Sequence, residues 1–115
     1  MNKNKFDSIE SLIINEQTDK AQTELSKLGS EFFKDVDYLY LRSKIFYANK
    51  LYYIALDTLL IATEFGESNK VFDLISKIYN DLGNMPLSKK VASLDLRREA
   101  INSLKKELTG ISQKG

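Results

Sequence analysis

The apolar residues of this chain recur at the spacing of helices, with polar or glycine-containing segments between the periodic stretches. Positions three and four apart share one face of a helix. This spacing predicts helices over residues of about 6–16, 18–28, 35–48, 51–65, 69–82 and 86–109. Because the turns within each pair are only a few residues long, the paired helices are expected to form antiparallel hairpins. The predicted fold class is all-α, with three stacked antiparallel helix pairs and a long C-terminal helix.

Residues typical of helix ends support these boundaries. Asp35 and Ser68 are predicted N-caps, because a short polar side chain accepts hydrogen bonds from the free N–H groups of a first turn. Thr18 followed by Asp19 is another such start. Pro86 suits a first turn, where its missing N–H is not needed. A residue with left-handed backbone is expected to end a helix after each of four apolar segments, at Gly29, Gly66, Gly83 and Gly110.

One order of large and small residues occurs three times. It is clearest at Leu39, Ser43, Phe46, Tyr52, Ala55, Leu59 and Ala62. Similar residues follow 33 positions later at Phe72, Ser76, Tyr79, Met85, Ser88 and Ala92. A looser match lies 34 positions earlier at Leu12, Ala21, Leu25 and Leu28. The small residues Ser43, Ala55 and Ala62 would let helix axes approach closely. We expect one domain, 1–115, with repeats at about 5–34, 35–68 and 69–95.

Two expected helices stand out by their apolar residues. The helix over 51–65 is apolar on nearly all sides, with Asp57 and Glu64 on one narrow stripe, so it is expected to be covered on nearly all sides. The last helix, about 86–109, is longer than one repeat and is expected to cap the stack. Its apolar stripe is Leu87, Val91, Leu94, Ile101, Leu104 and Leu108. Docking of a partner on this stripe is the alternative.

Composition argues against most enzyme chemistry. The chain has 115 residues, enough for one core, and contains neither cysteine nor histidine. It therefore lacks the usual thiolate and imidazole metal ligands and the commonest general base. No glycine-rich phosphate loop or nucleophile motif is present either. We expect no enzyme activity, no catalytic residue, no metal site and no cofactor.

The sequence also argues against membrane insertion. The most apolar run, 51–65, is 15 residues long and contains two acids, whereas a spanning helix needs roughly 20 apolar residues. The basic start of the chain is followed by Asp7 and Glu10 without a long apolar core, which does not match a signal peptide. A cytoplasmic location is expected.

A row of tyrosines predicts the partner-binding face. In a helical repeat stack the first helix of each pair lines the concave side. Tyr40, Lys44 and Tyr47 share one face of such a helix, with spacings of four and three. Tyrosine combines a large apolar surface with a polar tip, which favours it at interfaces. The predicted partner-binding groove consists of Tyr40, Lys44, Tyr47, Asp73, Lys77 and Asn80, and a second interface of Phe6 and Ile13. Internal packing of Tyr47 is the alternative.

Basic residues gather near the end of the chain. Residues 84–115 hold seven Lys or Arg and three acids, a net charge of +4. Six of these cations could meet a nucleic-acid backbone or an acidic partner: Lys89, Lys90, Arg97, Arg98, Lys105 and Lys106. They are spread around the helix, and no aromatic residue follows Tyr79 to stack on a base. A solvated basic face is favoured, and nucleic-acid binding is the less favoured alternative.

The repeat period and these residues resemble the tetratricopeptide family, whose units are helix pairs of 34 residues. The resemblance covers roughly 5–95 and is carried by Leu39, Ser43, Phe46, Tyr52, Ala55 and Ala62, with half of another unit at Phe72, Ser76, Tyr79 and Gly83. It implies a concave groove that binds another polypeptide. One class of the family, the co-chaperones that clamp a C-terminal carboxylate, is disfavoured. Among the groove positions that this class uses, only Lys70 carries a matching residue here.

In size and layout the chain is similar to the small needle-subunit chaperones of bacterial type III secretion systems, a virulence apparatus. The stretch from Leu39 to Leu82, with Ala55 in its second helix and Leu82-Gly83 closing the next one, carries this likeness. It implies a groove that holds the amphipathic C-terminal helix of the needle subunit, and a second small helical chaperone over the amino-terminal pair. The predicted function is therefore a protein-binding chaperone or adaptor. A homo-oligomeric scaffold remains an alternative.

Overall fold

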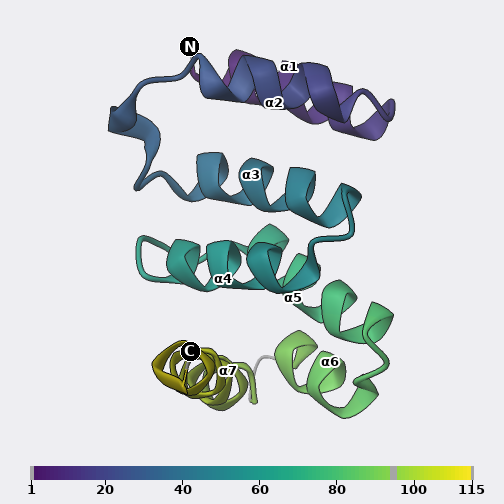
Figure 1. Cartoon of the computed structure of the whole chain (residues 1–115), viewed down its shortest axis with the longest axis vertical. Helices are drawn as coiled ribbons and strands as arrows, with labels where there is room; N and C mark the ends of the chain where they lie inside the picture. Colours follow the sequence, from purple (N-terminus) through teal and green to yellow (C-terminus); the bar gives the residue numbers. More distant parts are fainter. Residues whose placement is uncertain (1, 94–95, 115) are drawn as a thin grey trace. The chain divides into compact units, whose positions relative to one another are not determined.

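The computed structural model describes residues 2–93 and 96–114, and the side chains of 5–93 and 96–106. Every regular element in these ranges is helical (Figure 1), which confirms the all-α prediction. The elements are α1 (Asn2–Ile14), α2 (Thr18–Ser26), the 3-10 helix η1 (Ser30–Phe32), α3 (Val36–Ala48), α4 (Tyr52–Thr63), α5 (Asn69–Asp81), α6 (Met85–Ala92) and α7 (Arg97–Lys114).

The helices form two compact units. The first, Met1–Ser68, contains α1 to α4, and the second, Asn69–Gly115, contains α5 to α7. Their boundary coincides with the expected junction between the second and third repeats.

The turns inside the three helix pairs have the same geometry. Glu16 and Lys50 both have a φ of 62°, and Gly83 has a φ of 82°. In each turn the next N–H donates to a carbonyl five residues back: Gln17 to Leu12 (2.8 Å), Leu51 to Phe46 (2.9 Å) and Asn84 to Tyr79 (2.8 Å). This is the Schellman motif. Because the three left-handed residues are 34 and 33 positions apart, the sequence period has a direct counterpart in the backbone.

The glycine prediction is correct at Gly83 and wrong at the other three positions. Gly29 has an extended backbone (φ −76°, ψ 171°) before η1, and Gly110 lies inside α7. Gly83 is the only described glycine with a positive φ, so Gly66 does not form a left-handed cap either. At Gly66 close packing explains the residue, because a Cβ there would lie 3.0 Å from Cγ2 of Val36.

The predicted helix starts are partly confirmed. The Asp35 carboxylate accepts a hydrogen bond from the Tyr38 N–H (3.1 Å), as expected of an N-cap. Pro86 lies in the first turn of α6, which Asn84 caps by accepting from the Leu87 N–H (3.2 Å). The N-cap of α2 is Gln17, without a side-chain hydrogen bond, so the assignment of this cap to Thr18 was wrong.

In the first unit α3 is the central helix. It packs against α1, α2 and α4, and it lies between the α1–α2 pair and α4 (Figure 1). The small residues Ser43, Ala55 and Ala62 are fully buried, as predicted. The principal buried apolar residues of the unit are Ile9, Ala21, Leu25, Tyr38, Leu39, Leu41, Ile45, Ala55, Leu56, Leu59, Leu60 and Ala62.

Helix α4 is not covered on nearly all sides, which corrects the sequence prediction. Tyr53, Ile54, Ile61 and Phe65 are 63%, 49%, 43% and 43% exposed. Within the unit α3 is the helix that packs against α4. One face of α4 is therefore buried, and another carries exposed apolar side chains beside the exposed acids Asp57 and Glu64.

In the second unit the expected helix over 86–109 is divided into α6 and α7. Ser93 has an extended backbone (φ −82°, ψ 128°) and ends α6. The Arg97 Nε–H donates to the Val91 carbonyl (2.8 Å), and the Arg97 guanidinium carbon lies 4.2 Å from the Phe72 ring centroid. Arg97 therefore satisfies a carbonyl that a continuous helix would have bonded internally.

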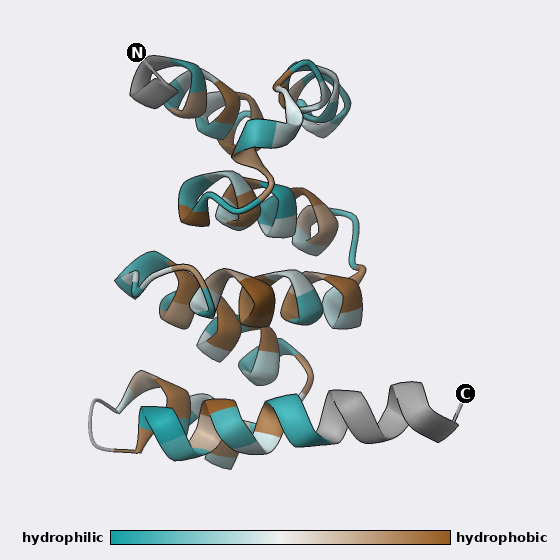
Figure 2. Cartoon of the chain, turned by 90° about the vertical axis from the view of Figure 1, so that its left-hand side faces the viewer, coloured by the Kyte–Doolittle hydropathy of each residue, from teal (hydrophilic) through white to brown (hydrophobic). Residues whose placement is uncertain are grey.

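The apolar stripe expected along this segment is largely packed inside. Val91, Ile101 and Leu104 are buried, and Leu87 is half-buried. Leu94 and the side chain of Leu108 lie outside the described residues. In the coloured part of α7 in Figure 2, the side that faces the viewer is mostly hydrophilic. The described part of the stripe is thus covered, which disfavours partner docking along it.

Candidate helix-binding groove

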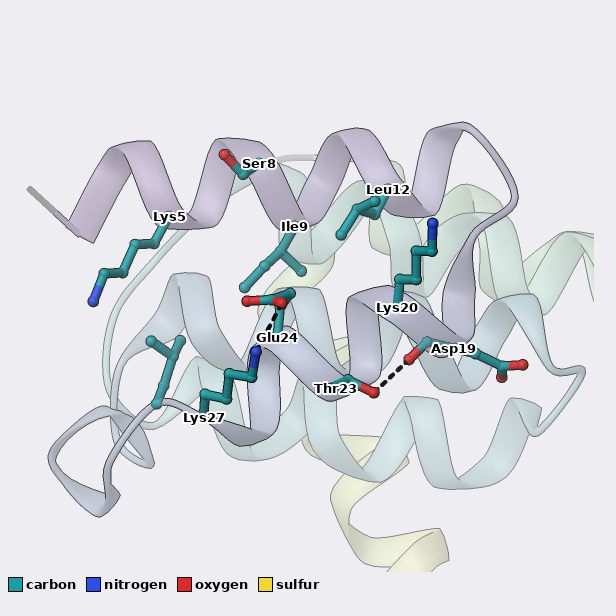
Figure 3. Close-up of a pocket in the computed structure, with 10 residues that line it drawn as sticks. Lys5, Ser8, Ile9, Leu12, Asp19, Lys20, Thr23, Glu24 and Lys27 are labelled. Atoms are coloured by element: carbon teal, nitrogen blue, oxygen red, sulfur yellow. Dashed lines mark hydrogen bonds and ion pairs between the residues drawn. The ribbon is translucent and has the colours of Figure 1, made fainter.

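A groove of about 860 Å³ runs between α1 and α2 (Figure 3). It lies entirely in the first unit. The residues that line it are Lys5, Ser8, Ile9, Leu12, Asp19, Lys20, Thr23, Glu24, Lys27 and Leu28.

The lining follows from two facing rows of residues. On α1 the row is Lys5, Ser8, Ile9 and Leu12, and on α2 and its C-terminal end it is Lys20, Thr23, Glu24 and Lys27. Each row has the spacing i, i+3, i+4, i+7, which places its members on one helix face. The α2 row is entirely polar, and the large apolar residue of α2, Leu25, is buried and does not line the groove. The two helices pack against each other and leave a groove along the side where these two rows face.

The floor of the groove is apolar. Ile9 and Leu12 point from α1 towards α2 (Figure 3). Ile9 is 3% exposed, and Leu12 and Leu28 are half-buried. Because Ile9 is already covered, an apolar ligand surface placed here would cover Leu12 and Leu28 and would gain free energy in proportion to the area removed from water.

The rim of the groove is charged. The Lys27 ammonium lies 3.1 Å from the Glu24 carboxylate, and both side chains are largely exposed, so this pair adds little to stability. Lys5 and Lys20 make no ion pair with any described side chain. Asp19 lies in the first turn of α2, where the helix dipole favours an acid. Two ammonium groups thus remain available to a ligand at the rim.

The tyrosine row predicted from the sequence lies on α3 and packs within the first unit. Tyr40, Lys44 and Tyr47 are all half-buried. The Lys44 Nζ is 3.7 Å from the Glu10 carboxylate and 5.5 Å from the Tyr40 ring centroid, which ties α3 to α1. The Tyr47 ring centroid is 5.7 Å from that of Tyr52 on α4. These contacts favour the internal-packing alternative for Tyr47, and a binding role of the row stays a prediction.

The other half of the predicted groove lies in the second unit. Asp73, Lys77 and Asn80 are exposed on one face of α5. Their role in binding likewise stays a prediction.

The predicted second interface has a packing role at Phe6. The Phe6 ring meets the Phe32 ring edge to face, with centroids 5.9 Å apart and an interplanar angle of 82°, and so joins η1 to α1. Ile13 is half-buried, whereas the neighbouring Ile14 is 68% exposed. Neither Phe6 nor Ile13 lines the groove between α1 and α2.

Two surfaces escaped the sequence prediction. One is the groove, because nothing in the sequence indicated that the α1 row and the α2 row face each other. The other is the exposed apolar row on α4 and the turn that follows it, which we call the α4 stripe and define as Ile54, Ile61 and Phe65. A usable signal for the groove was the all-polar i, i+3, i+4, i+7 row beginning at Lys20.

The basic residues near the end of the chain are only partly gathered, since Arg98 and Lys106 line one hollow on α7 together with the acidic Glu99. Arg97 is engaged with the Val91 carbonyl and the Phe72 ring. Lys89 and Lys90 are exposed on α6, and Arg98 is exposed on α7 next to the acidic Glu99. This arrangement favours a solvated face over a nucleic-acid site.

Among the described side chains, no group of three or more acids is placed to hold a metal ion. None of the described helices has the length and apolar character needed to cross a bilayer. No protein-family model matches the chain, and no curated protein or solved structure matches it significantly.

Proposed function

We propose that this chain is a protein-binding module that holds an amphipathic helix of a partner protein in the groove between α1 and α2. The observation that carries the proposal is the apolar floor of Ile9, Leu12 and Leu28 beneath a charged rim. Recognition of a helix in a groove uses this arrangement, in which apolar residues at i, i+3, i+4 and i+7 of the ligand enter the groove.

The dimensions agree with a helical ligand. The α1 row from Lys5 to Leu12 spans seven residues, which is about 10 Å, or two turns of a helix. A ligand helix lying along it presents about four apolar residues to the floor over that length. Acidic residues beside this apolar stripe would meet the ammonium groups of Lys5 and Lys20, and so fix the orientation of the ligand.

A narrower proposal is that the partner is the needle subunit of a type III secretion system, held in the cytoplasm together with a second small chaperone. It rests on the resemblance to that chaperone class and is supported by the turns at Glu16, Lys50 and Gly83, whose spacing fits a helix-pair repeat. Burial of an amphipathic helix in a groove would keep a self-polymerising subunit monomeric.

Blocking the groove tests the proposal. Thr23 lines the groove and is exposed, so Thr23→Trp fills the space above the floor without disturbing the core. Gln22 is the matched control, because it is exposed on α2 and does not line the groove. Affinity capture from the native cell, with mass spectrometry, is expected to recover the same partner with the wild type and Gln22→Trp and to lose it with Thr23→Trp.

A third variant distinguishes the groove from the tyrosine row. If Tyr40→Ala with Tyr47→Ala loses the partner while Thr23→Trp retains it, and circular dichroism shows unchanged helix content, the α3 row is the binding site and the groove assignment is wrong. Equal capture by all variants also contradicts a site between α1 and α2.

A further inference from the structure

The α4 stripe is a second exposed apolar surface of the first unit. Ile54, Ile61 and Phe65 lie at i, i+7 and i+11, which places them on one face of α4 and its C-terminal turn. Each is between 43% and 49% exposed. A row of large exposed apolar side chains on one helix marks an interaction surface.

The stripe has an acidic edge. Asp57 follows Ile54 by three residues, and Glu64 follows Ile61 by three residues, so both acids lie on the same side of the stripe. Both are exposed. The exposed face of α4 is therefore an apolar row bordered by two carboxylates.

The groove between α1 and α2 has the complementary properties. Its floor is apolar, and its rim carries Lys5, Lys20 and Asp19 besides the Lys27–Glu24 pair, so lysines outnumber acids there by three to two. The segment from Ile54 to Ile61 spans seven residues, about 10 Å, as does the α1 row from Lys5 to Leu12. The chain thus carries on its own surface a helix with the chemistry that its groove fits.

We propose that the α4 stripe of one molecule docks in the α1–α2 groove of a second copy. Antiparallel contact of two stripes would place the Asp57 carboxylate near its own copy, whereas docking in the groove would place it near the ammonium group of Lys5 or Lys20. Like charges brought together in this way oppose association. The heterologous contact, in which the stripe of one copy enters the groove of the next, is the one in which the Asp57 carboxylate meets an ammonium group and the apolar stripe meets the apolar floor.

This contact cannot form within one molecule. Because α3 lies between the α1–α2 pair and α4 (Figure 1), α4 is kept apart from the two groove helices of its own molecule. A heterologous contact leaves one groove and one stripe unused at the ends of the assembly, so it extends to chains or closes into rings. The inference rests on the proposed function in one respect, namely that the groove accepts a helix.

Mixing two blocked variants tests the inference. Thr23→Trp blocks the groove and leaves the stripe intact. Ile61→Asp places a charge in the stripe and leaves the groove intact; Ile61 is exposed, so the fold is preserved. By sedimentation velocity, wild type is expected to exceed the monomer mass of 13.2 kDa increasingly with concentration. For each variant alone, the Kd of self-association is expected to rise at least about tenfold. The equimolar mixture of the two variants is expected to form a dimer that does not grow into larger assemblies.

The outcomes separate this inference from the proposed function. A wild type that stays monomeric up to millimolar concentration overturns self-association, even if Thr23→Trp still loses a partner in the capture experiment. Dimers of wild type that persist in Thr23→Trp, or in Ile61→Asp alone, show a contact between like surfaces and also overturn it. Self-association that is lost in Thr23→Trp, together with unchanged partner capture, retains the inference and rejects the groove as the partner site.

Discussion

At the scale of single residues, the three left-handed positions show how one backbone turn is made from different side chains. Gly83 adopts a positive φ at little cost, whereas Glu16 and Lys50 adopt the same conformation against the steric preference of a residue with a Cβ. The Schellman hydrogen bonds, such as the one from the Leu51 N–H to the Phe46 carbonyl, hold these residues in place.

Opposite substitutions at equivalent turns are expected to have opposite effects on stability. Lys50→Gly removes the clash of the Cβ in the left-handed region and is expected to raise the free energy of unfolding by about 0.5–1 kcal/mol, since greater freedom of the unfolded chain offsets part of the gain. Gly83→Ala introduces that clash and is expected to lower it by about 1 kcal/mol. Urea unfolding followed by circular dichroism measures both.

The space around Gly83 makes this comparison clean. A Cβ at Gly83 would meet no atom within 4 Å, so the cost of Gly83→Ala comes from the backbone and not from a collision with neighbours. If Lys50→Gly destabilises the protein, the turn at Lys50 depends on its side chain, and the equivalence of the turns fails.

At the scale of elements, the break between α6 and α7 depends on one side chain. Arg97 begins α7, donates to the Val91 carbonyl at 2.8 Å and covers the Phe72 ring of α5. It therefore contacts all three helices of the second unit, whereas the next residue, Arg98, is exposed.

Removal of Arg97 is expected to weaken the second unit. Arg97→Ala leaves the Val91 carbonyl without its donor and deletes the cation–π contact, which together should lower the free energy of unfolding by about 1–3 kcal/mol. Arg98→Ala is the matched control, expected within about 0.5 kcal/mol of wild type, as is usual at an exposed position. Equal losses for the two variants in urea unfolding would contradict this role of Arg97.

The sequence predicted helix boundaries correctly where the spacing of nearby apolar residues determines them. It failed where a contact with a residue far away in the sequence determines a boundary. The boundaries of α3 and α5 follow from the apolar spacing, and Asp35 marks the start of α3 correctly. The break before Arg97 was not predicted, because it depends on Phe72, 25 positions earlier, and the apolar period continues across it.

The candidate site was harder to predict than the helices, because a groove is a property of two facing elements. Each row that lines it is ordinary by itself, and its opening results from polar residues of α2 lying opposite Ile9 and Leu12. The tyrosine row drew attention by composition, but Lys44 and Tyr47 are occupied by contacts to Glu10 and Tyr52. Residue type alone did not separate a packing role from a binding role.

At the scale of the whole molecule, groove and stripe couple self-association to ligand binding. A groove that holds the α4 stripe of a second copy cannot hold another helix at the same time. The apparent affinity for a helical ligand is therefore reduced by the fraction of grooves that remain free. In a variant whose stripe is blocked, no second copy occupies the groove, so all grooves remain available to the ligand.

A peptide taken from the chain itself makes the coupling measurable. A stapled, fluorescent helix of residues 51–66 carries the stripe and its acidic edge. At a chain concentration about ten times the self-association Kd, about a quarter of the wild-type grooves remain free, so the wild type is expected to bind the peptide about fourfold more weakly than Ile61→Asp. Fluorescence anisotropy measures this difference, with Thr23→Trp as the variant expected not to bind. A difference between the wild type and Ile61→Asp arises only when one copy occupies the groove of another. If the two proteins bind the peptide equally at that concentration, the stripe of a second copy does not compete with the peptide for the groove.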